Sequence, residues 1–289
     1  MSSLDPRSPV FQPVPKSHTD TIRNVWRHNL EEEVKRIAHL AQQYPVIAMD
    51  TEFPGIVFHV DEEREDLAYQ TVRVNVNHLK MIQLGITLGT ESGDYPQPTS
   101  TWQFNFEFNL EEDYYSQDSI DLLKTSGIEF ALHRDFGIQQ SDFAAHFITS
   151  GLVLTEDVKW VSFHSAYDFG YLLRALTGEM LGETEEEFLS KLKLYFLEFY
   201  DIKLMVSAEE RLKGGLNKLA DTLNVTRVGQ AHQAGSDALV TLEVFHRVKE
   251  ELCPQGIPQE QVSVLFGLGS GRQPGFVYRS TASEAKLRP

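Results

Sequence analysis

The stretch Val46-Ile47-Ala48-Met49-Asp50-Thr51-Glu52 sets both the fold and the chemistry that the rest of the sequence must fit. Its leading apolar residues are typical of a short buried strand, and Pro54-Gly55 ends the pattern. Residues two apart on a strand point to the same face, so Asp50 and Glu52 would lie side by side. Two carboxylates on one buried face repel each other, and their pKa values rise unless a cation lies between them. The stretch therefore predicts a divalent metal site at the end of a buried strand.

Two more acids follow regular elements later in the chain. Asp168 lies in the first turn of a predicted helix, just after a strand that ends at Phe163, and Asp237 begins the last long helix. In α/β proteins, active and ligand-binding sites commonly lie where strands end and helices begin. Either aspartate alone would more often be a helix cap, and His232, five residues before Asp237, would alone be a surface residue. Together with the acids of the first strand, they indicate one site.

The types of ligand indicate the reaction. Carboxylate oxygens favour Mg²⁺ or Mn²⁺ over softer cations. Two such ions, about 3.5–4 Å apart, can clamp a phosphodiester and stabilise both the attacking and the leaving oxygen. The predicted metal ligands are Asp50, Glu52, Asp168 and Asp237, and His232 would take a proton from the attacking water.

The pattern along the chain predicts a single α/β domain, with a mixed sheet that has helices on both faces. Apolar residues recur at helical spacing over residues 22–44, and Pro45 stops that helix. Trp102, Phe104 and Phe106 alternate with polar residues, so this strand is expected to have one buried face and to form a hairpin with the strand before it. The other expected strands cover 81–88, 158–163 and 199–202, and the other expected helices cover 117–125, 141–149, 166–176, 185–196, 216–223 and 236–252.

The local composition predicts where the domain begins and ends, and the overall composition excludes some classes of protein. We expect a disordered arm over 1–17, the domain over 18–267 and a flexible tail over 268–289. The single cysteine, Cys253, excludes a disulfide framework and a cysteine zinc site, and predicts an intracellular protein. No apolar run reaches the ~18 residues of a membrane span, so no membrane partner is expected.

The net charge is unusual for a protein that binds nucleic acid. Forty-two acids and 26 bases give a formal charge of −16, whereas phosphate binding usually leaves a basic footprint. Metal ions held by the acids could face the phosphates instead, or a partner protein could deliver the substrate. The charge could also serve only to keep the protein soluble.

Three motifs resemble those of the four-acid exonuclease superfamily that uses a histidine base. They are residues 49–55 (MDTEFPG), 164–172 (HSAYDFGYL) and 232–237 (HQAGSD). More narrowly, they resemble the Caf-one/Pop-two deadenylases, the nuclease subunits of the Ccr-four–Not complex. The resemblance covers nearly the whole chain, since 22–26, 100–106, 213–216 and 266–271 also match. Departures are mild: Ala166 stands where many relatives have glycine, and Ala231 where a polar residue is common.

The resemblance implies a ribonuclease-H-like fold and a poly(A)-specific 3′→5′ exoribonuclease that releases AMP from messenger RNA tails with two Mg²⁺ or Mn²⁺ ions. It assigns Asp50, Glu52, Asp168 and Asp237 as ligands and His232 as the base. Phe163 and His164 would lie against the terminal nucleotide, where Phe163 could stack on a base, although a plain core aromatic explains Phe163 as well.

The same resemblance implies several partners. These are the poly(A) 3′ end of RNA, a Not-type scaffold, a second deadenylase and proteins of the Tob/BTG class, in the cytoplasm and also in the nucleus. Two alternatives stay open. A general 3′→5′ exonuclease would need the same five residues, and a bridging subunit with dispensable activity would fit an acidic single-domain chain.

Overall fold

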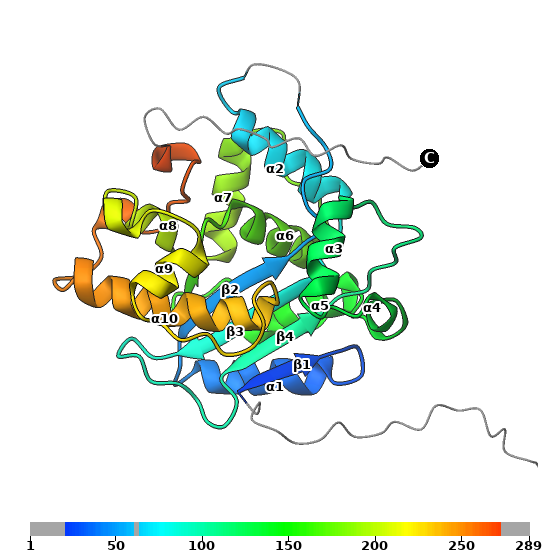
Figure 1. The fold of residues 1–289 in the computed structure, drawn as a ribbon, viewed down its shortest axis with the longest axis horizontal. Coiled ribbons are helices and arrows are strands. Elements are labelled where there is room, and N and C mark those ends of the chain that lie inside the picture. Colours follow the sequence, from blue (N-terminus) through cyan, green and yellow to red (C-terminus); the bar gives the residue numbers. More distant parts are fainter. Residues whose placement is uncertain (1–20, 61–63, 273–289) are drawn as a thin grey trace, which may run out of the picture.

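The computed structural model describes residues 21–60 and 64–272, which form a six-stranded sheet with helices on both faces (Figure 1). The strand order is β1-β4-β3-β2-β5-β6. The strands are β1 (Ile22–Val25), β2 (Val46–Glu52), β3 (Gln83–Gly89), β4 (Thr101–Asn105), β5 (Lys159–Ser162) and β6 (Glu198–Asp201). The α-helices are α1 (Leu30–Ala41), α2 (Leu67–His78), α3 (Gln117–Thr125), α4 (Phe130–Phe136), α5 (Gln140–Phe147), α6 (Ala166–Thr177), α7 (Glu185–Tyr195), α8 (Ile202–Met205), α9 (Leu216–Thr222) and α10 (Ala234–Leu252).

Strand pairing confirms the predicted mixed sheet. β3 runs antiparallel to β2 on one side and to β4 on the other, so the expected hairpin is present. β5 is parallel to both β2 and β6, and β1 is parallel to β4. Among the described residues, no helix is long and apolar enough to cross a membrane.

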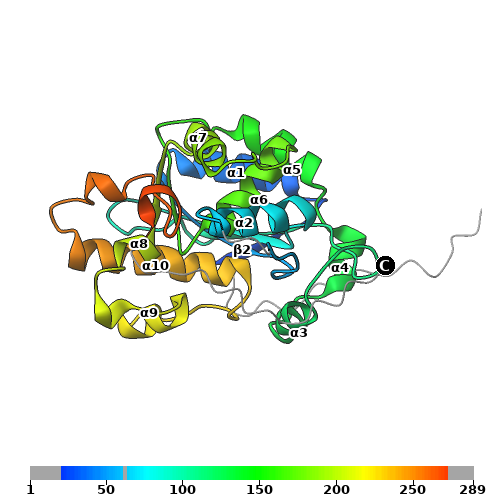
Figure 2. The same cartoon turned by 90° about the horizontal axis from the view of Figure 1, so that it is seen from above.

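Successive side chains of β2 point to opposite faces of the sheet, and each face is covered by a different layer of helices. Ile47 and Met49 belong to the core under α1, α5 and α6, whereas Val46 and Ala48 belong to the core under α10. Figure 2 shows these two layers on opposite sides of β2. Because the side-chain period of a strand is two, Asp50 and Glu52 continue the row that faces α10.

Two predicted elements were wrong. Residues 22–25 form strand β1 rather than the start of a helix, and a turn at Trp26 to Asn29 separates it from α1. Strand β4 is buried on both faces, not one, because α10 covers its polar side and the amides there bond to one another.

Three α-helices, α2, α4 and the four-residue α8, were not predicted from the sequence. Helix α2 buries Tyr69, Val72 and Val76 at helical spacing, but the buried polar residues Gln70, Thr71, Asn75 and Asn77 lie among them and obscure the apolar pattern. The short helix α4 buries only Phe130 and His133.

The predicted arm at 1–17 and most of the predicted tail at 268–289 lie outside the described residues. Leu268 and Arg272 are described: Leu268 is buried in the main core, and Arg272 forms an ion pair with Glu185 at the start of α7.

Candidate active site

Strand β2 and helix α6 bring Asp50, Glu52 and Asp168 to one end of the sheet. Helix α6 follows β5, which pairs in parallel with β2, so the first turn of α6 lies beside the end of β2. Thr51 fixes Asp168 there: its backbone N–H and its hydroxyl both donate to Oδ1 of Asp168, at 2.8 and 2.6 Å. Asp168 is 8% exposed, so it is held by hydrogen bonds away from bulk water.

The first turn of α10 and the turn just before it bring Asp237 and His232 to the same place. The backbone N–H of His232 donates to Oδ2 of Asp237 at 2.9 Å, with His232 in the left-handed region at φ 60°. Ligand atoms of Glu52, His232 and Asp237 all lie within 4.8 Å of one another, which makes them a candidate metal-holding group among the described residues. The prediction treated His232 as a base rather than a ligand, and its position is compatible with either role.

Buried amides of the sheet anchor the start of α10. Gly85 allows the close approach, because a Cβ there would lie 1.9 Å from the carbonyl oxygen of Ala234. The side-chain oxygen of Gln83 accepts from the N–H of Ala234, and that of Gln103 accepts from Gly235. These two glutamines satisfy N–H groups that the helix itself leaves unpaired. They therefore fix where Asp237 points.

The acids strongly raise one another's pKa values. Burial raises the pKa of Asp50 well above its usual range, and the nearby charges of Asp237, Asp168 and Glu52 raise it further. Burial and the charges of Asp237 and Asp168 likewise raise the pKa of Glu52. Burial raises the pKa of Asp168 to about 6, although the bonds from Thr51 oppose the rise. These acids therefore behave as one coupled set in which the repulsion between carboxylates dominates.

Sequence reasoning missed one cation beside these acids. Arg227, in the loop before α10, pairs with Oδ1 of Asp237 at 2.7 Å and also donates to Ser236 and Asn217. Its charge lowers the pKa of Asp50 and Glu52. No local pattern marked Arg227, because the loop that carries it has no periodicity.

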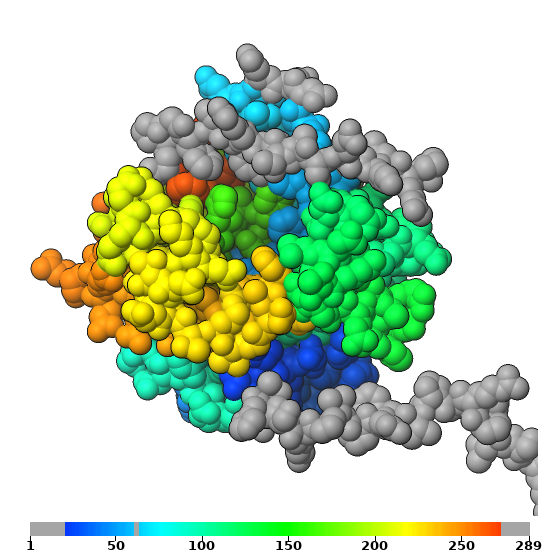
Figure 3. Space-filling view, in the orientation of Figure 1, coloured from blue at the N-terminus to red at the C-terminus, as the bar shows by residue number. Residues whose placement is uncertain are grey.

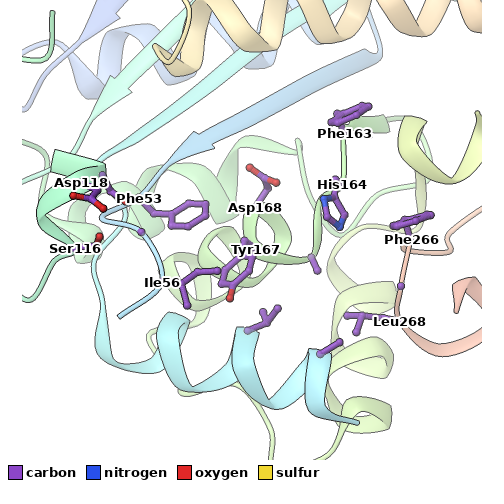
Figure 4. Close-up of a pocket in the computed structure, with 16 residues that line it drawn as sticks. Phe53, Ile56, Ser116, Asp118, Phe163, His164, Tyr167, Asp168, Phe266 and Leu268 are labelled. Carbon is purple, nitrogen blue, oxygen red and sulfur yellow. The ribbon is translucent and has the colours of Figure 1, made fainter. Parts of the chain in front are cut away.

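A cleft of about 790 Å³ runs past Asp168 (Figure 4). Figure 3 shows the surface hollowed between the segment around α9 and that around α3. Phe163, His164 and Phe266 lie at one end of the cleft, and Phe53 and Ser116 lie at the other. The two residues predicted to meet the terminal nucleotide, Phe163 and His164, therefore do line the cleft.

Comparison with known proteins then decides the family. Residues 25–145 match the model of the CAF1 family ribonuclease. Poly(A) ribonuclease pop2 of Schizosaccharomyces pombe is 46% identical over 257 residues, which cover 88% of this chain and 77% of that protein. The chain belongs to the CAF1 family of ribonucleases. The resemblance inferred from the three motifs is confirmed.

Solved structures of CAF1 relatives share the fold. The structure of S. pombe Pop2p in its Mg²⁺- and Mn²⁺-bound form superimposes with a TM-score of 0.84 at 45% identity, and covers 86% of this chain and all of that one (100%). Yeast CAF1 co-crystallised with the NOT1 MIF4G domain gives a TM-score of 0.74 at 30% identity, and the match covers 88% of this chain and 100% of that one. Exonuclease I is 12% identical and has a TM-score of 0.51, and the match covers 73% of this chain and 41% of that one. It therefore shares the fold alone. The predicted ribonuclease-H-like α/β fold is confirmed.

Proposed function

We propose that this CAF1-family ribonuclease removes 3′-terminal adenosines from the poly(A) tails of messenger RNA, in the 3′→5′ direction, and releases AMP. The observation that carries the proposal is the convergence of the acids of β2, α6 and α10 at one end of the sheet, with His232 beside them and with Asp168 lining the cleft. The S. pombe relative, named a poly(A) ribonuclease, supports RNA and adenosine as the substrate.

The side chains present fit two divalent cations, Mg²⁺ or Mn²⁺. All four acids offer carboxylate oxygens, which hard cations prefer, and the raised pKa values of Asp50, Glu52 and Asp168 mark a deficit of positive charge that such ions would fill. The metal-bound form of S. pombe Pop2p supports the same choice of ions. The ligands would be Asp50, Glu52, Asp168 and Asp237. When bound, the ions supply positive charge that stabilises the scissile phosphate and the leaving 3′-oxygen.

The chain's own groups position the acids and move the proton. Thr51 holds Asp168 and Arg227 holds Asp237, so two of the proposed ligands are fixed before any ion arrives. His232 is exposed, and one of its ring nitrogens lies within 4.8 Å of carboxylate oxygens of Glu52 and Asp237, where it could take a proton from the attacking water and pass it to solvent. Because the backbone N–H of His232 bonds to Asp237, the base and one ligand are coupled in position.

Aromatic side chains supply the binding surface for the nucleotide. Phe163 and Phe266 line one end of the cleft, and stacking of a base on an aromatic ring is worth about 1–3 kcal/mol per base. Stacking alone accepts any base. A general 3′→5′ exonuclease therefore remains the alternative that the experiment must separate.

We further propose that a Not-type scaffold binds this chain, because the yeast CAF1 that it resembles was co-crystallised with NOT1. The formal charge of −16 is consistent with delivery of RNA by a partner rather than by a basic surface. A second deadenylase, Tob/BTG-type partners, a bridging role and a cytoplasmic and nuclear location stay predictions from the motif resemblance.

The test follows the length of one RNA over time. The substrate carries a 5′ label, a mixed-sequence body and a run of 3′ adenosines, and it is incubated with Mg²⁺, with Mn²⁺ or with EDTA. The enzymes are the full chain, Asp50→Asn, and Asp221→Asn, which changes an exposed acid on α9. We expect a metal-dependent ladder that shortens through the adenosines and pauses at the body, with Asp221→Asn like the wild type and Asp50→Asn inactive.

Each other outcome has one meaning. Equal speed through the tail and the body would favour the general exonuclease. Full activity of Asp50→Asn would contradict the proposed site, and an inactive wild type would favour the bridging role for the isolated subunit.

A further inference from the structure

A carboxylate outside the proposed ligand set, that of Asp201, is fully buried at the end of β6 (0% exposed). Its Oδ1 accepts from the backbone N–H groups of His164 at 2.8 Å and Lys203 at 3.0 Å. Its Oδ2 accepts from the N–H and the hydroxyl of Ser165, both at 3.3 Å, and from the N–H of Phe266 at 3.0 Å. One side chain thus joins the β5–α6 turn, the start of α8 and the loop around residue 266.

The donor pattern requires a carboxylate at this position. All five hydrogen bonds come to the Asp201 side chain from N–H or O–H groups, and an ionised carboxylate has two oxygens and no donor. An asparagine has nearly the same shape, but its NH₂ group would have to face one of the two sets of donors. The substitution would therefore leave His164 and Lys203, or Ser165 and Phe266, without an acceptor.

The segments that Asp201 joins form one end wall of the cleft. His164 is held in the left-handed region at φ 57°, and its ring meets that of Phe266 edge-on, with centroids 5.4 Å apart. The ammonium of Lys203 lies 5.5 Å from the ring centre of Phe163 and 6.0 Å from that of Phe266. Figure 4 places Phe163, His164 and Phe266 together on the side of the cleft away from Phe53.

The proposed metal ligands near this wall have anchors of their own, although burial and also the charge of Asp201 raise the pKa of Asp168. Asp168 is held by Thr51, and Asp237 is held by Arg227 and the turn at His232. Losing one half of the Asp201 contacts would loosen the end wall while both of these anchors stay in place.

We propose that Asp201 is a positioning residue for the substrate: it fixes His164 and Phe266 as one rigid wall against which the 3′-terminal nucleotides bind. The proposal rests on the proposed ribonuclease function, because it assumes that RNA occupies the cleft. It assigns Asp201 an effect on the binding of RNA rather than on the chemical step.

The test compares kcat and KM on the A-tailed RNA for Asp201→Asn, Phe266→Ala, the double variant and Ser165→Ala. We expect Asp201→Asn and Phe266→Ala each to raise KM about tenfold, with kcat within about threefold of the wild type. Because both act through the same wall, the double variant should have a KM within about threefold of Phe266→Ala. Ser165→Ala loses one of the five hydrogen bonds, so its KM should stay within about twofold.

Two further readouts separate positioning from a general loss of structure. Affinity for Mn²⁺, measured by calorimetry, should be unchanged in Asp201→Asn, because Thr51 and Arg227 still hold their acids. In the wild type, the amide hydrogens of His164, Ser165, Lys203 and Phe266 should exchange with solvent at a common slow rate, and more slowly still with AMP and Mn²⁺ bound. This second readout needs no variant, and so it holds even if Asp201→Asn does not fold.

Several results would overturn the proposal. These are a fall in kcat with KM unchanged, KM effects that multiply in the double variant, weakened Mn²⁺ binding, or amide exchange at unrelated rates. A wild type that does not shorten the RNA would instead refute the proposed function, so the two failures can be told apart.

Discussion

Asp201 and Asp50 both lie near the ends of strands in the same sheet, yet their surroundings are opposite. Asp201 on β6 is surrounded by five hydrogen-bond donors. Asp50 on β2 is surrounded by other acids, which raise its pKa, with Arg227 as the opposing charge. The comparison teaches that burial alone does not mark an ion site. A buried acid that faces donors holds the fold together, whereas a buried acid that faces acids needs a cation.

The largest expected effect comes from removing one charge of the acidic group. Asp50→Asn should lower the rate of RNA shortening by at least about a thousandfold, because one of the four proposed metal ligands is lost. The same change should raise the free energy of unfolding in EDTA by about 1–2 kcal/mol, since one repelling charge is gone. Urea unfolding in EDTA, beside the RNA assay, measures both. An inactive variant that is also less stable than the wild type in EDTA would contradict the claim that Asp50 is repelled by the neighbouring acids.

The second prediction removes the positive charge of Arg227, which opposes the negative charges of the acids. Arg227→Met removes the cation paired with Asp237, so activity should fall about tenfold and stability in EDTA should fall by about 1–2 kcal/mol. The matched control is Arg247→Met, whose side chain is half-exposed and lies 3.9 Å from Glu250. The control should leave both quantities unchanged. Wild-type activity in Arg227→Met would show that Asp237 needs no such support.

Thr51 tests how Asp168 is held. Thr51→Val keeps the backbone N–H bond to Asp168 but removes the 2.6 Å hydroxyl bond. A hydrogen bond to a charged group is worth about 1.5–3 kcal/mol, so kcat should fall about five- to tenfold. Thr51→Ser retains the hydroxyl and should stay within about twofold of the wild type. Equal kinetics for the two variants would mean that the hydroxyl does not position Asp168.

The smallest effect on activity is expected at His133, a buried neutral group far from the acids in the chain. Burial lowers the pKa of His133 to about 4, although its bond to the carbonyl of Phe106 opposes the shift. The unfolded chain binds a proton at this histidine below about pH 6.5, and the folded chain does so only near pH 4. Its contribution to stability is therefore complete above pH 6.5 and is lost as the pH falls toward 4, by up to about 3 kcal/mol.

The measurement is urea unfolding of the wild type and His133→Gln between pH 7.5 and 4. The wild type should lose more stability than the variant over this range, while the two shorten RNA at similar rates at pH 7.5. Parallel stability curves would contradict the assignment of the pH dependence to His133.

Sequence patterns predicted the elements whose burial follows a simple period. Strand β2 matches its prediction, and α3 matches as well, because apolar residues mark their inner faces. Strand β1 was missed because it is a short strand at the edge of the sheet, and helix α2 was missed because buried amides such as Asn75 interrupt its apolar pattern. The acids and His232 could be named from motifs, and the fold brings them together. Arg227 and Asp201 could not, since their roles depend on contacts between segments far apart in the chain.

The most direct test of the central claim is a calorimetric titration of the EDTA-treated protein with Mn²⁺ at neutral pH, with thermal unfolding at each end point. We predict two ions bound per chain and a higher melting temperature for the wild type, because the ions supply the charge that the acids lack. Asp237→Asn should bind fewer ions and gain less stability. A wild type that binds no Mn²⁺, or binds it without stabilisation, would contradict the claim that these four acids form an ion site.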